Sequence, residues 1–295
     1  MALMSFRRPK TDIAAAPVAD FLDGFSIEVM PRTAAGIEDF RALLPAGTRV
    51  YVAHIAGTPI DEMVATVARL TAEGFAPMPH LPARIIPDRA TLADWLARYR
   101  DAGASQALVL GGGVNEPVGA FHEAMQLLET GLFDGFTRLH IAGHPEGNRD
   151  IDPAGGEDRV MEALRRKQDF ARQTGVDMAI VTQFAFESAP IIDWTARLAA
   201  NGITLPVHIG VAGPAKLQTM IKFAIACGVG PSLRVLQRRA RDVTKLVLPF
   251  EPDTLVAELA AHKATHPDFA IERVHFFPLG GIKTSAEWIS RAAAR

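Results

Sequence analysis

One carboxylate lies near the end of an otherwise apolar run. Glu28 follows Phe25-Ser26-Ile27 and precedes Val29-Met30-Pro31, so the alternation of a strand places it at the end of a buried strand. Burial disfavours the charged form of a carboxyl group and raises its pKa, which suits the group to donate a proton near neutral pH. We therefore predict that Glu28 is a general acid. The alternative is a structural glutamate that pairs with an arginine.

Three histidines, His54, His80 and His144, each end a β-rich run and begin a loop. Together they could ligate zinc or iron, but a metal-dependent hydrolase would usually carry a His-x-His pair on its first strand, and this chain has none there. We predict no metal site, and expect these histidines to donate hydrogen bonds to a large ligand or to be structural. No lysine ends a β-rich run, which argues against a Schiff-base aldolase.

Glycines follow two other β-rich runs, as Gly111–Gly113 and as Gly280-Gly281. A backbone without Cβ atoms can approach a bound group closely. Because Gly280-Gly281 precedes a helix start, its N–H groups, with the loop around Gly210, could bind a phosphate. A barrel enzyme acting on a phosphorylated metabolite therefore stays open. The Gly-x-Gly-x-x-Gly pattern of dinucleotide-binding folds is absent.

These residues have to be positioned by eight β-rich runs that alternate with longer amphipathic segments, the pattern of βα units. In one such segment, Ile60, Met63, Val67 and Leu70 recur at helical spacing. The predicted strands are Phe25–Pro31, Arg49–Ile55, Ala76–Pro82, Gln106–Gly112, Thr137–Pro145, Met178–Phe186, Leu205–Gly213 and Ile271–Gly281.

Eight repeats in 295 residues predict a (β/α)8 TIM barrel that forms a single domain over residues 1–295. We expect an extra N-terminal helix or arm over residues 1–20 and extra helices between strands seven and eight, within Val229–Phe269. The active site of such a barrel lies at the C-terminal ends of its strands. Glu28 and the three histidines all fall there.

Composition narrows the class of partner. The chain has 31 Lys and Arg against 33 Asp and Glu, a net charge of −2, so it lacks the basic field that holds nucleic acid. A single cysteine excludes an intramolecular disulfide framework. No apolar run approaches the ~20 residues of a membrane span, and the N-terminus does not resemble a secretory signal. We expect a cytoplasmic protein, with a homo-oligomer left open.

Taken in order, the strand-end residues resemble those of the methylenetetrahydrofolate reductase family over nearly the whole chain, from about Phe25 to Trp288. That family has a (β/α)8 barrel, in agreement with the strand count. The first run, with Glu28 and Pro31, resembles the family's Phe-Glu-Phe-Phe-Pro-Pro segment, and Pro79-His80-Leu81 resembles its Pro-His-Leu. Ala142–Gly147 is similar to its Ala-Gly-Tyr-Pro-Glu-Gly. Thr182-Gln183-Phe184 resembles its Thr-Gln-Phe, and Val274–Phe277 resembles its His-Phe-Tyr.

The resemblance implies an oxidoreductase of one-carbon metabolism and methionine biosynthesis that interconverts 5,10-methylenetetrahydrofolate and 5-methyltetrahydrofolate. NAD(P)H would be the co-substrate and FAD the usual bound cofactor. Glu28 would help open the five-membered ring of the folate to an iminium ion, to which a hydride adds. Gln183 would hydrogen-bond the pterin, and Leu217 would lie against the stacked ligand. Gly113, Leu279 and Gly281 are further implied folate-binding positions. The implied cofactor-binding positions are His54, His80, Leu110, Gly111, Gly112, Ala142, His144, Glu146 and Arg172.

Three motifs depart from the family. Its Arg-Gly-Asp is replaced by Gly111–Gly113, its tyrosine before Pro-Glu by His144, and its Leu-Asn-Arg by Leu279-Gly280-Gly281. Three polar contacts to flavin or folate are lost together. Either FAD is bound differently or weakly, or hydride passes directly from NAD(P)H to the folate. A non-catalytic folate-binding protein is a third possibility.

Overall fold

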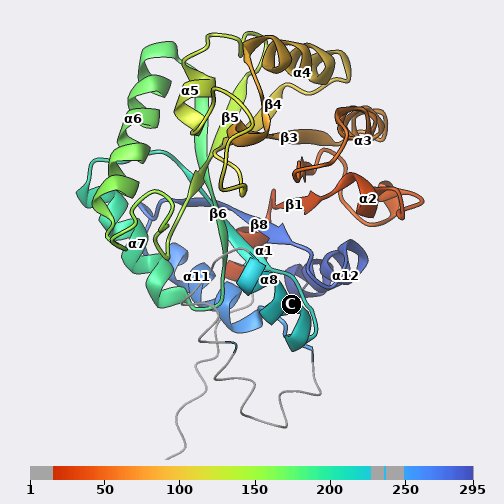
Figure 1. The fold of residues 1–295 in the computed structure, drawn as a ribbon. Coiled ribbons are helices and arrows are strands. Elements are labelled where there is room, and N and C mark those ends of the chain that lie inside the picture. The colour runs from red at the N-terminus through yellow and green to blue at the C-terminus, as the bar shows by residue number, and fades with distance from the viewer. Residues whose placement is uncertain (1–15, 227–235, 237–248, 295) are drawn as a thin grey trace, which may run out of the picture.

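Eight parallel strands close into a barrel in chain order in a computed structural model, which describes residues 16–226, 236 and 249–294 (Figure 1). This topology confirms the predicted (β/α)8 barrel. The strands are β1 (Ser26–Val29), β2 (Arg49–Val52), β3 (Ala76–Pro82), β4 (Gln106–Leu110), β5 (Arg138–Gly143), β6 (Asp177–Ala185), β7 (Val207–Ala212) and β8 (Ile271–Phe277).

Helices connect the strands around the outside of the barrel (Figure 1). In α3, the side chains of Met63, Val67 and Leu70 form one fully buried face, as the spacing predicts. None of the helices in the described part of the chain is long and apolar enough to cross a membrane. The helices between β1 and β7 are α2 (Pro31–Ala34), α3 (Ile60–Ala72), α4 (Arg89–Asp101), α5 (Ala124–Leu128), α6 (Asp158–Thr174) and α7 (Ser188–Ala200), with 3-10 turns η1 (Phe40–Ala42) and η2 (Ala83–Ile85).

The predicted additions to the barrel are present where the structure describes them. Helix α1 (Ala16–Leu22) precedes β1, whereas residues 1–15 of the predicted arm lie outside the described residues. Both α8 (Leu217–Ala226) and α11 (Asp253–Thr265) lie between β7 and β8. Of the region predicted to hold extra helices, from 229 to 269, α11 is described. Residues 229–235 and 237–248 of that region lie outside the described residues. Helix α12 (Ile282–Ala293) follows β8.

Alternate residues of each strand face opposite sides of the barrel wall. One set, including Ile27, Val50 and Val274, packs against the helices in the main core. The other set faces the barrel interior, where Tyr51 and Met78 belong to a separate apolar cluster. Polar side chains share that interior and are almost completely inaccessible to solvent: Ser26, His140, His208 and His275. The interior of this barrel is therefore unusually rich in histidine.

Strand register places the first strand between Tyr51 and His275. Glu28 pairs with Tyr51 on β2, and Ser26 pairs with His275 on β8. Because β1 is only four residues long, Glu28 lies one residue from its C-terminal end. Closure of the barrel therefore brings residues separated by most of the chain next to one another.

Candidate functional site

Glu28 reaches the barrel interior from the C-terminal end of β1, with 21% of its side chain exposed. Burial raises the pKa of its carboxyl group to about 7, so about half of the molecules hold the proton at neutral pH. The titratable side chains within 4.0 Å of its carboxylate, among the described residues, are those of His80 and His275 rather than the arginine of the structural alternative. The site therefore has a proton donor poised near neutral pH.

The two imidazoles beside Glu28 are uncharged. Oε2 of Glu28 is 3.5 Å from Nε2 of His80 and 4.0 Å from Nε2 of His275. Burial lowers the pKa of His80 to about 3 and takes that of His275 well below its usual value. Nε2 of His80 has no hydrogen-bond partner among the described residues. Both rings are thus available as hydrogen-bonding groups without competing with Glu28 for its proton.

A chain of buried polar side chains continues from His275 toward the other end of the barrel. Nδ1 of His275 is 3.0 Å from the Ser26 hydroxyl, and the centroid of the His275 ring is 4.2 Å from that of the Tyr51 ring. Tyr51 in turn makes a short hydrogen bond to Nδ1 of His140. The guanidinium of Arg138 donates to Nε2 of His140 at 2.9 Å. These five residues, Ser26, Tyr51, Arg138, His140 and His275, are called the interior chain below.

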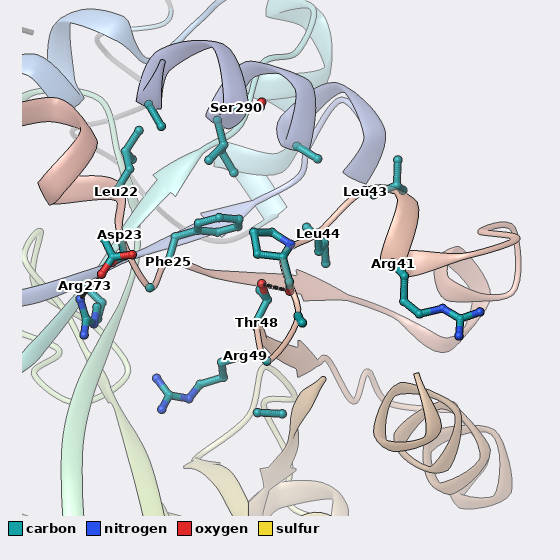
Figure 2. A pocket seen from close by; sticks show the side chains of 18 of the residues that line it. Leu22, Asp23, Phe25, Arg41, Leu43, Leu44, Thr48, Arg49, Arg273 and Ser290 are labelled. Carbon is teal, nitrogen blue, oxygen red and sulfur yellow. Dashed lines mark hydrogen bonds and ion pairs between the residues drawn. The ribbon is translucent and has the colours of Figure 1, made fainter. Parts of the chain in front are cut away.

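An ion-pair cluster anchors the N-terminal end of the interior chain. Arg138 donates to Glu272 at 2.9 Å, and Nε2 of His208 lies 2.9 Å from the same carboxylate oxygen. The hydrogen bond from His208, with the charge of Arg138, lowers the pKa of Glu272 to about 2. Arg138 and Glu272 also line a cavity of about 750 Å³. Figure 2 shows this cavity with Arg49 and Arg273 on one side and apolar side chains such as Phe25 along it.

That cavity opens at the start of the strands, at the end of the barrel opposite Glu28. It is lined by the first residues of β2, β3 and β5, namely Arg49, Ala76 and Arg138. In TIM barrels, this face contributes to stability and the other carries the chemistry. We therefore place the candidate site at the Glu28 end, which we call the mouth.

Most residues of the interior chain were not predicted from the sequence. His275 appeared only within a matched segment, and Tyr51, His140 and His208 were not singled out. A signal was present, because polar residues recur at every second position, as in Arg138-Leu139-His140 and Arg49-Val50-Tyr51. Their mutual contacts could not be seen, since they join different strands.

Gln183 lies at an irregularity of β6. The register with β7 shifts between Val181 and Phe184, as in a β-bulge, which re-aims side chains and often lies beside active sites. The Thr182 hydroxyl donates to the Gln183 carbonyl at 2.8 Å and accepts from the Gly210 N–H at 2.9 Å. Oε1 of Gln183 is buried and has no partner among the described residues. This oxygen is therefore a hydrogen-bond acceptor that no described residue satisfies.

The histidines of the predicted metal alternative do not come together. Nε2 of His54 lies 3.1 Å from the Thr58 carbonyl, and its ring lies 4.9 Å from that of Trp95. His144 lies beside Asn148, whose Nδ2 is 3.3 Å from its Nδ1. Within the described ranges, no three His, Cys, Asp or Glu side chains could hold one metal ion. In the described residues, His54, His80 and His144 are therefore not part of a group of three ligating side chains.

The glycines after β4 have different roles. The Gly111 carbonyl accepts from the Arg84 N–H at 3.0 Å, which ties this loop to η2. Gly112 has φ +99° and lies close to Pro82, so its backbone requires glycine. Gly113 is exposed, and a Cβ built there meets no atom within 4 Å. Gly113 is thus the position where a ligand has room to approach the backbone.

Packing accounts for Gly280 after β8. A Cβ at Gly280 would lie 2.1 Å from the Pro214 carbonyl oxygen. Close contact with the loop at Pro214 is therefore enough to require glycine at this position, and no bound phosphate is needed to explain it. Gly281 has φ +105° and caps α12. Leu279 packs against the same apolar cluster that buries Leu217 at the start of α8. Leu217 therefore contributes to packing.

The remaining predicted positions are divided between the mouth and the far side of the protein. Leu110 and Ala142 are partly exposed near the ends of β4 and β5, and Glu146 follows β5. Arg172 lies in the last turn of α6, close to the start of β6, where it is 59% exposed and pairs with Asp169 at 3.6 Å. The structure does not bring Arg172 to the mouth, because α6 runs antiparallel to the strands.

The predicted flavin positions do not fit the pyrophosphate of FAD. That group carries negative charge and is usually held by cations or backbone N–H groups. Burial lowers the pKa of His80 to about 3 and that of His144 to about 4, so both are uncharged at neutral pH. Arg172, the one arginine predicted for this role, lies at the opposite end of the barrel. The described side chains at these positions therefore supply no positive charge at the mouth for a flavin pyrophosphate.

Comparison with known proteins shows the fold and no more. No family model matches the chain. A solved structure of an uncharacterized protein from Clostridium thermocellum, which binds two copies of 5-methyl-5,6,7,8-tetrahydrofolic acid, is similar with a TM-score of 0.56 and 11% identity, over 95% of this chain and 98% of that one. Triosephosphate isomerase from Bartonella henselae matches with a TM-score of 0.46 and 10% identity, over 92% and 99% of the two chains. The chain is a (β/α)8-barrel protein.

Proposed function

We propose that the mouth of the barrel binds a reduced folate and that Glu28 exchanges a proton with it. The observation that carries this proposal is the partly exposed Glu28 carboxyl group, whose pKa is about 7 and which faces two uncharged imidazoles. The free Oε1 of Gln183 supplies a hydrogen-bonding group for a pterin. A protein of similar fold that binds 5-methyltetrahydrofolic acid supports a reduced folate as the ligand class.

The reaction we propose is the interconversion of 5,10-methylenetetrahydrofolate and 5-methyltetrahydrofolate. In the reducing direction, Glu28 protonates a nitrogen of the five-membered ring, and the carbon–nitrogen bond breaks to leave an iminium ion. A hydride from NAD(P)H then adds to the exocyclic carbon. One proton and one hydride are added, which balances the conversion of the methylene bridge to a methyl group. In the reverse direction, the Glu28 carboxylate takes the proton back.

Glu28→Gln tests this role because it keeps the shape of the side chain and removes the acid. We expect 5-methyltetrahydrofolate still to stabilise the variant in a thermal shift assay, whereas turnover falls about a hundredfold or more, the usual size of a general-acid effect. Glu62→Gln, on the exposed face of α3, is the control and should retain full activity. Near-normal turnover by Glu28→Gln would remove Glu28 from this role.

The source of the hydride is tested separately. Because the predicted positions do not fit FAD, we propose direct transfer from the nicotinamide to the folate. The purified protein should then be colourless and should oxidise NADH or NADPH only when methylenetetrahydrofolate is present. A flavin absorption band would overturn direct transfer while leaving the role of Glu28 intact.

A second candidate function is non-catalytic folate binding. It is favoured by the glycines at 111–113, where the resembled family has charged residues. Stabilisation by 5-methyltetrahydrofolate without turnover of any nicotinamide would support it. Absence of folate binding, together with binding of inorganic phosphate at the mouth, would instead favour a phosphorylated metabolite.

A further inference from the structure

The cavity of about 750 Å³ at the starts of β2, β3 and β5, which we call the basal cavity, has a charged side and an apolar side. Four arginines and two carboxylates line it, so its lining is cationic although the whole chain has a net charge of −2. Figure 2 shows Arg49 and Arg273 below Phe25, and Leu22 with Ser290 of α12 above it. A cavity of this size with an apolar wall and a few polar groups is typical of small-molecule sites.

Three of the four arginines have carboxylate partners. Asp23 and Glu272, the two carboxylates that line the basal cavity, are both used in these pairs. The ion pairs are Arg41 with Asp39 at 2.9 Å, Arg138 with Asp177 at 3.1 Å and with Glu272 at 2.9 Å, and Arg273 with Asp23 at 3.8 Å.

Arg49 is the exception. Its Nε donates to Oε1 of Gln106 at 2.7 Å, but no described residue pairs a carboxylate with it or accepts a hydrogen bond from its two terminal nitrogens. Burial lowers the pKa of this guanidinium, which nevertheless stays charged, as guanidinium groups do in proteins. A partly buried charge without a counterion is costly. An anion in the basal cavity beside Arg49 would therefore be stabilised.

The charges and the walls of the basal cavity define the kind of anion. The two terminal nitrogens of a guanidinium match the two oxygens of a carboxylate. Because Arg49 is the single lining arginine that lacks a carboxylate among the described residues, one negative charge is enough to neutralise it. On the apolar side, the side chains of Leu22 and Ile289 are 2% and 4% exposed, and Phe25 lies beside them. These side chains offer a hydrocarbon surface to the rest of the ligand.

We propose that the basal cavity binds a monocarboxylate with an apolar tail, its head on Arg49 and its tail along Phe25 and Ile289. This site lies at the end of the barrel opposite Glu28 and does not depend on the proposed function.

Titration calorimetry of the whole protein with octanoate, octanol and inorganic phosphate separates the head from the tail. Octanol keeps the tail without the charge, and phosphate keeps a charge without the tail. We expect octanoate to bind about tenfold or more tightly than either, the usual effect of a charge-assisted hydrogen bond. From butyrate to octanoate, affinity should rise by about fourfold for each methylene that is buried. Equal binding of octanoate and octanol, or no binding of octanoate at millimolar concentration, would overturn the proposal.

Arg49→Gln removes the charge of the proposed head site. Octanoate affinity should fall about tenfold or more, to the level of octanol. Arg41→Gln is the matched control, because Arg41 lines the same cavity but is 66% exposed and paired with Asp39. It should keep full octanoate affinity. Unchanged affinity in Arg49→Gln contradicts the proposal, and urea unfolding of both variants checks that they are folded.

A second variant blocks the basal cavity and leaves Arg49 intact. Ala293 lines the cavity at an exposed position in the last turn of α12, so Ala293→Phe adds bulk without disturbing the core. It should weaken octanoate binding, whereas Ala199→Phe, at an exposed position in the last turn of α7, should not. Full octanoate affinity in Ala293→Phe would place the binding elsewhere and overturn the proposal.

Glu28→Gln separates this inference from the proposed function. Because Glu28 lies at the mouth, its substitution should leave octanoate affinity unchanged whether or not the protein turns over a folate. A loss of octanoate binding in Glu28→Gln would show that octanoate occupies the mouth, which contradicts a site in the basal cavity.

Discussion

Glu28 and His80 face each other at the mouth of the barrel, with Oε2 of the carboxyl group 3.5 Å from Nε2 of the imidazole. Burial moves the two groups in opposite directions, since the pKa of Glu28 rises to about 7 and that of His80 falls to about 3. Between these values, the neutral acid and the neutral imidazole coexist. The pair is therefore a proton donor beside an uncharged hydrogen-bonding group, and differs from an ordinary ion pair.

The first prediction concerns the pH dependence of the reaction. Folate reduction requires the protonated form of Glu28, so kcat/KM should be constant below its pKa and fall about tenfold per pH unit above about 7. The reverse reaction requires the carboxylate and should show the opposite slope. Initial rates between about pH 5.5 and 8.5 test both. A rate of folate reduction that rises across this range contradicts the assignment.

The second prediction concerns folding stability. The pKa of Glu28 is raised from 4.5 to about 7, so the folded state binds more protons than the unfolded state within this window. The contribution of Glu28 to stability is therefore complete below pH 4.5 and is lost as the pH rises toward 7, by about 3 kcal/mol in total. Urea unfolding of the unmodified protein and of Glu28→Gln, at several pH values, measures the difference. Parallel curves for the two proteins would contradict the raised pKa.

The third prediction concerns the free amide of Gln183. Because its Oε1 has no partner among the described residues, Gln183→Leu should leave the free energy of unfolding unchanged or increase it. Affinity for 5-methyltetrahydrofolate should fall about tenfold, the cost of about one lost hydrogen bond. Titration calorimetry and urea unfolding give the two quantities.

Gln168→Leu is the matched control for that variant. Gln168 is also buried, but its Nε2 donates to the Gly202 carbonyl at 2.9 Å and its Oε1 accepts from the Thr204 N–H at 2.6 Å. This substitution should therefore cost about 1–3 kcal/mol of stability and leave folate affinity unchanged. If Gln183→Leu behaved like Gln168→Leu, a role of Gln183 in binding would be ruled out.

The fourth prediction compares two glycines near the mouth. A Cβ at Gly210 would lie 2.5 Å from the carbonyl oxygens of Thr182 and Gln183, so Gly210→Ala must displace the irregular part of β6. We expect a loss of several kcal/mol of stability, and weaker folate binding even where the variant stays folded. Gly113→Ala has open space and should change stability by less than about 0.5 kcal/mol. Equal stability of the two variants in urea unfolding would contradict this packing.

Strand β1 shows how much local sequence can predict. Apolar alternation around Glu28 was sufficient to predict a strand and a buried carboxyl group at its end. Both features depend only on local periodicity, which every strand repeats, and the same periodicity predicts the eightfold barrel. The resemblance to methylenetetrahydrofolate reductases also pointed to Glu28 and Gln183, but it placed Arg172 in a cofactor site although the helix carries it to the other end.

The amino-acid sequence by itself therefore determined the eight strands and their order, because these follow from periodicity along a continuous chain. It placed the ends of several strands too late, since β2 ends at Val52 rather than Ile55 and β8 ends at Phe277 rather than Gly281. Tertiary structure alone decided what those residues meet. Ser26 and His275 are 249 positions apart, and only closure of the barrel between β1 and β8 brings them within hydrogen-bond distance. Burial in the closed interior also decided the charge of Glu28 and of its neighbouring histidines, since desolvation depends on what surrounds a group in space.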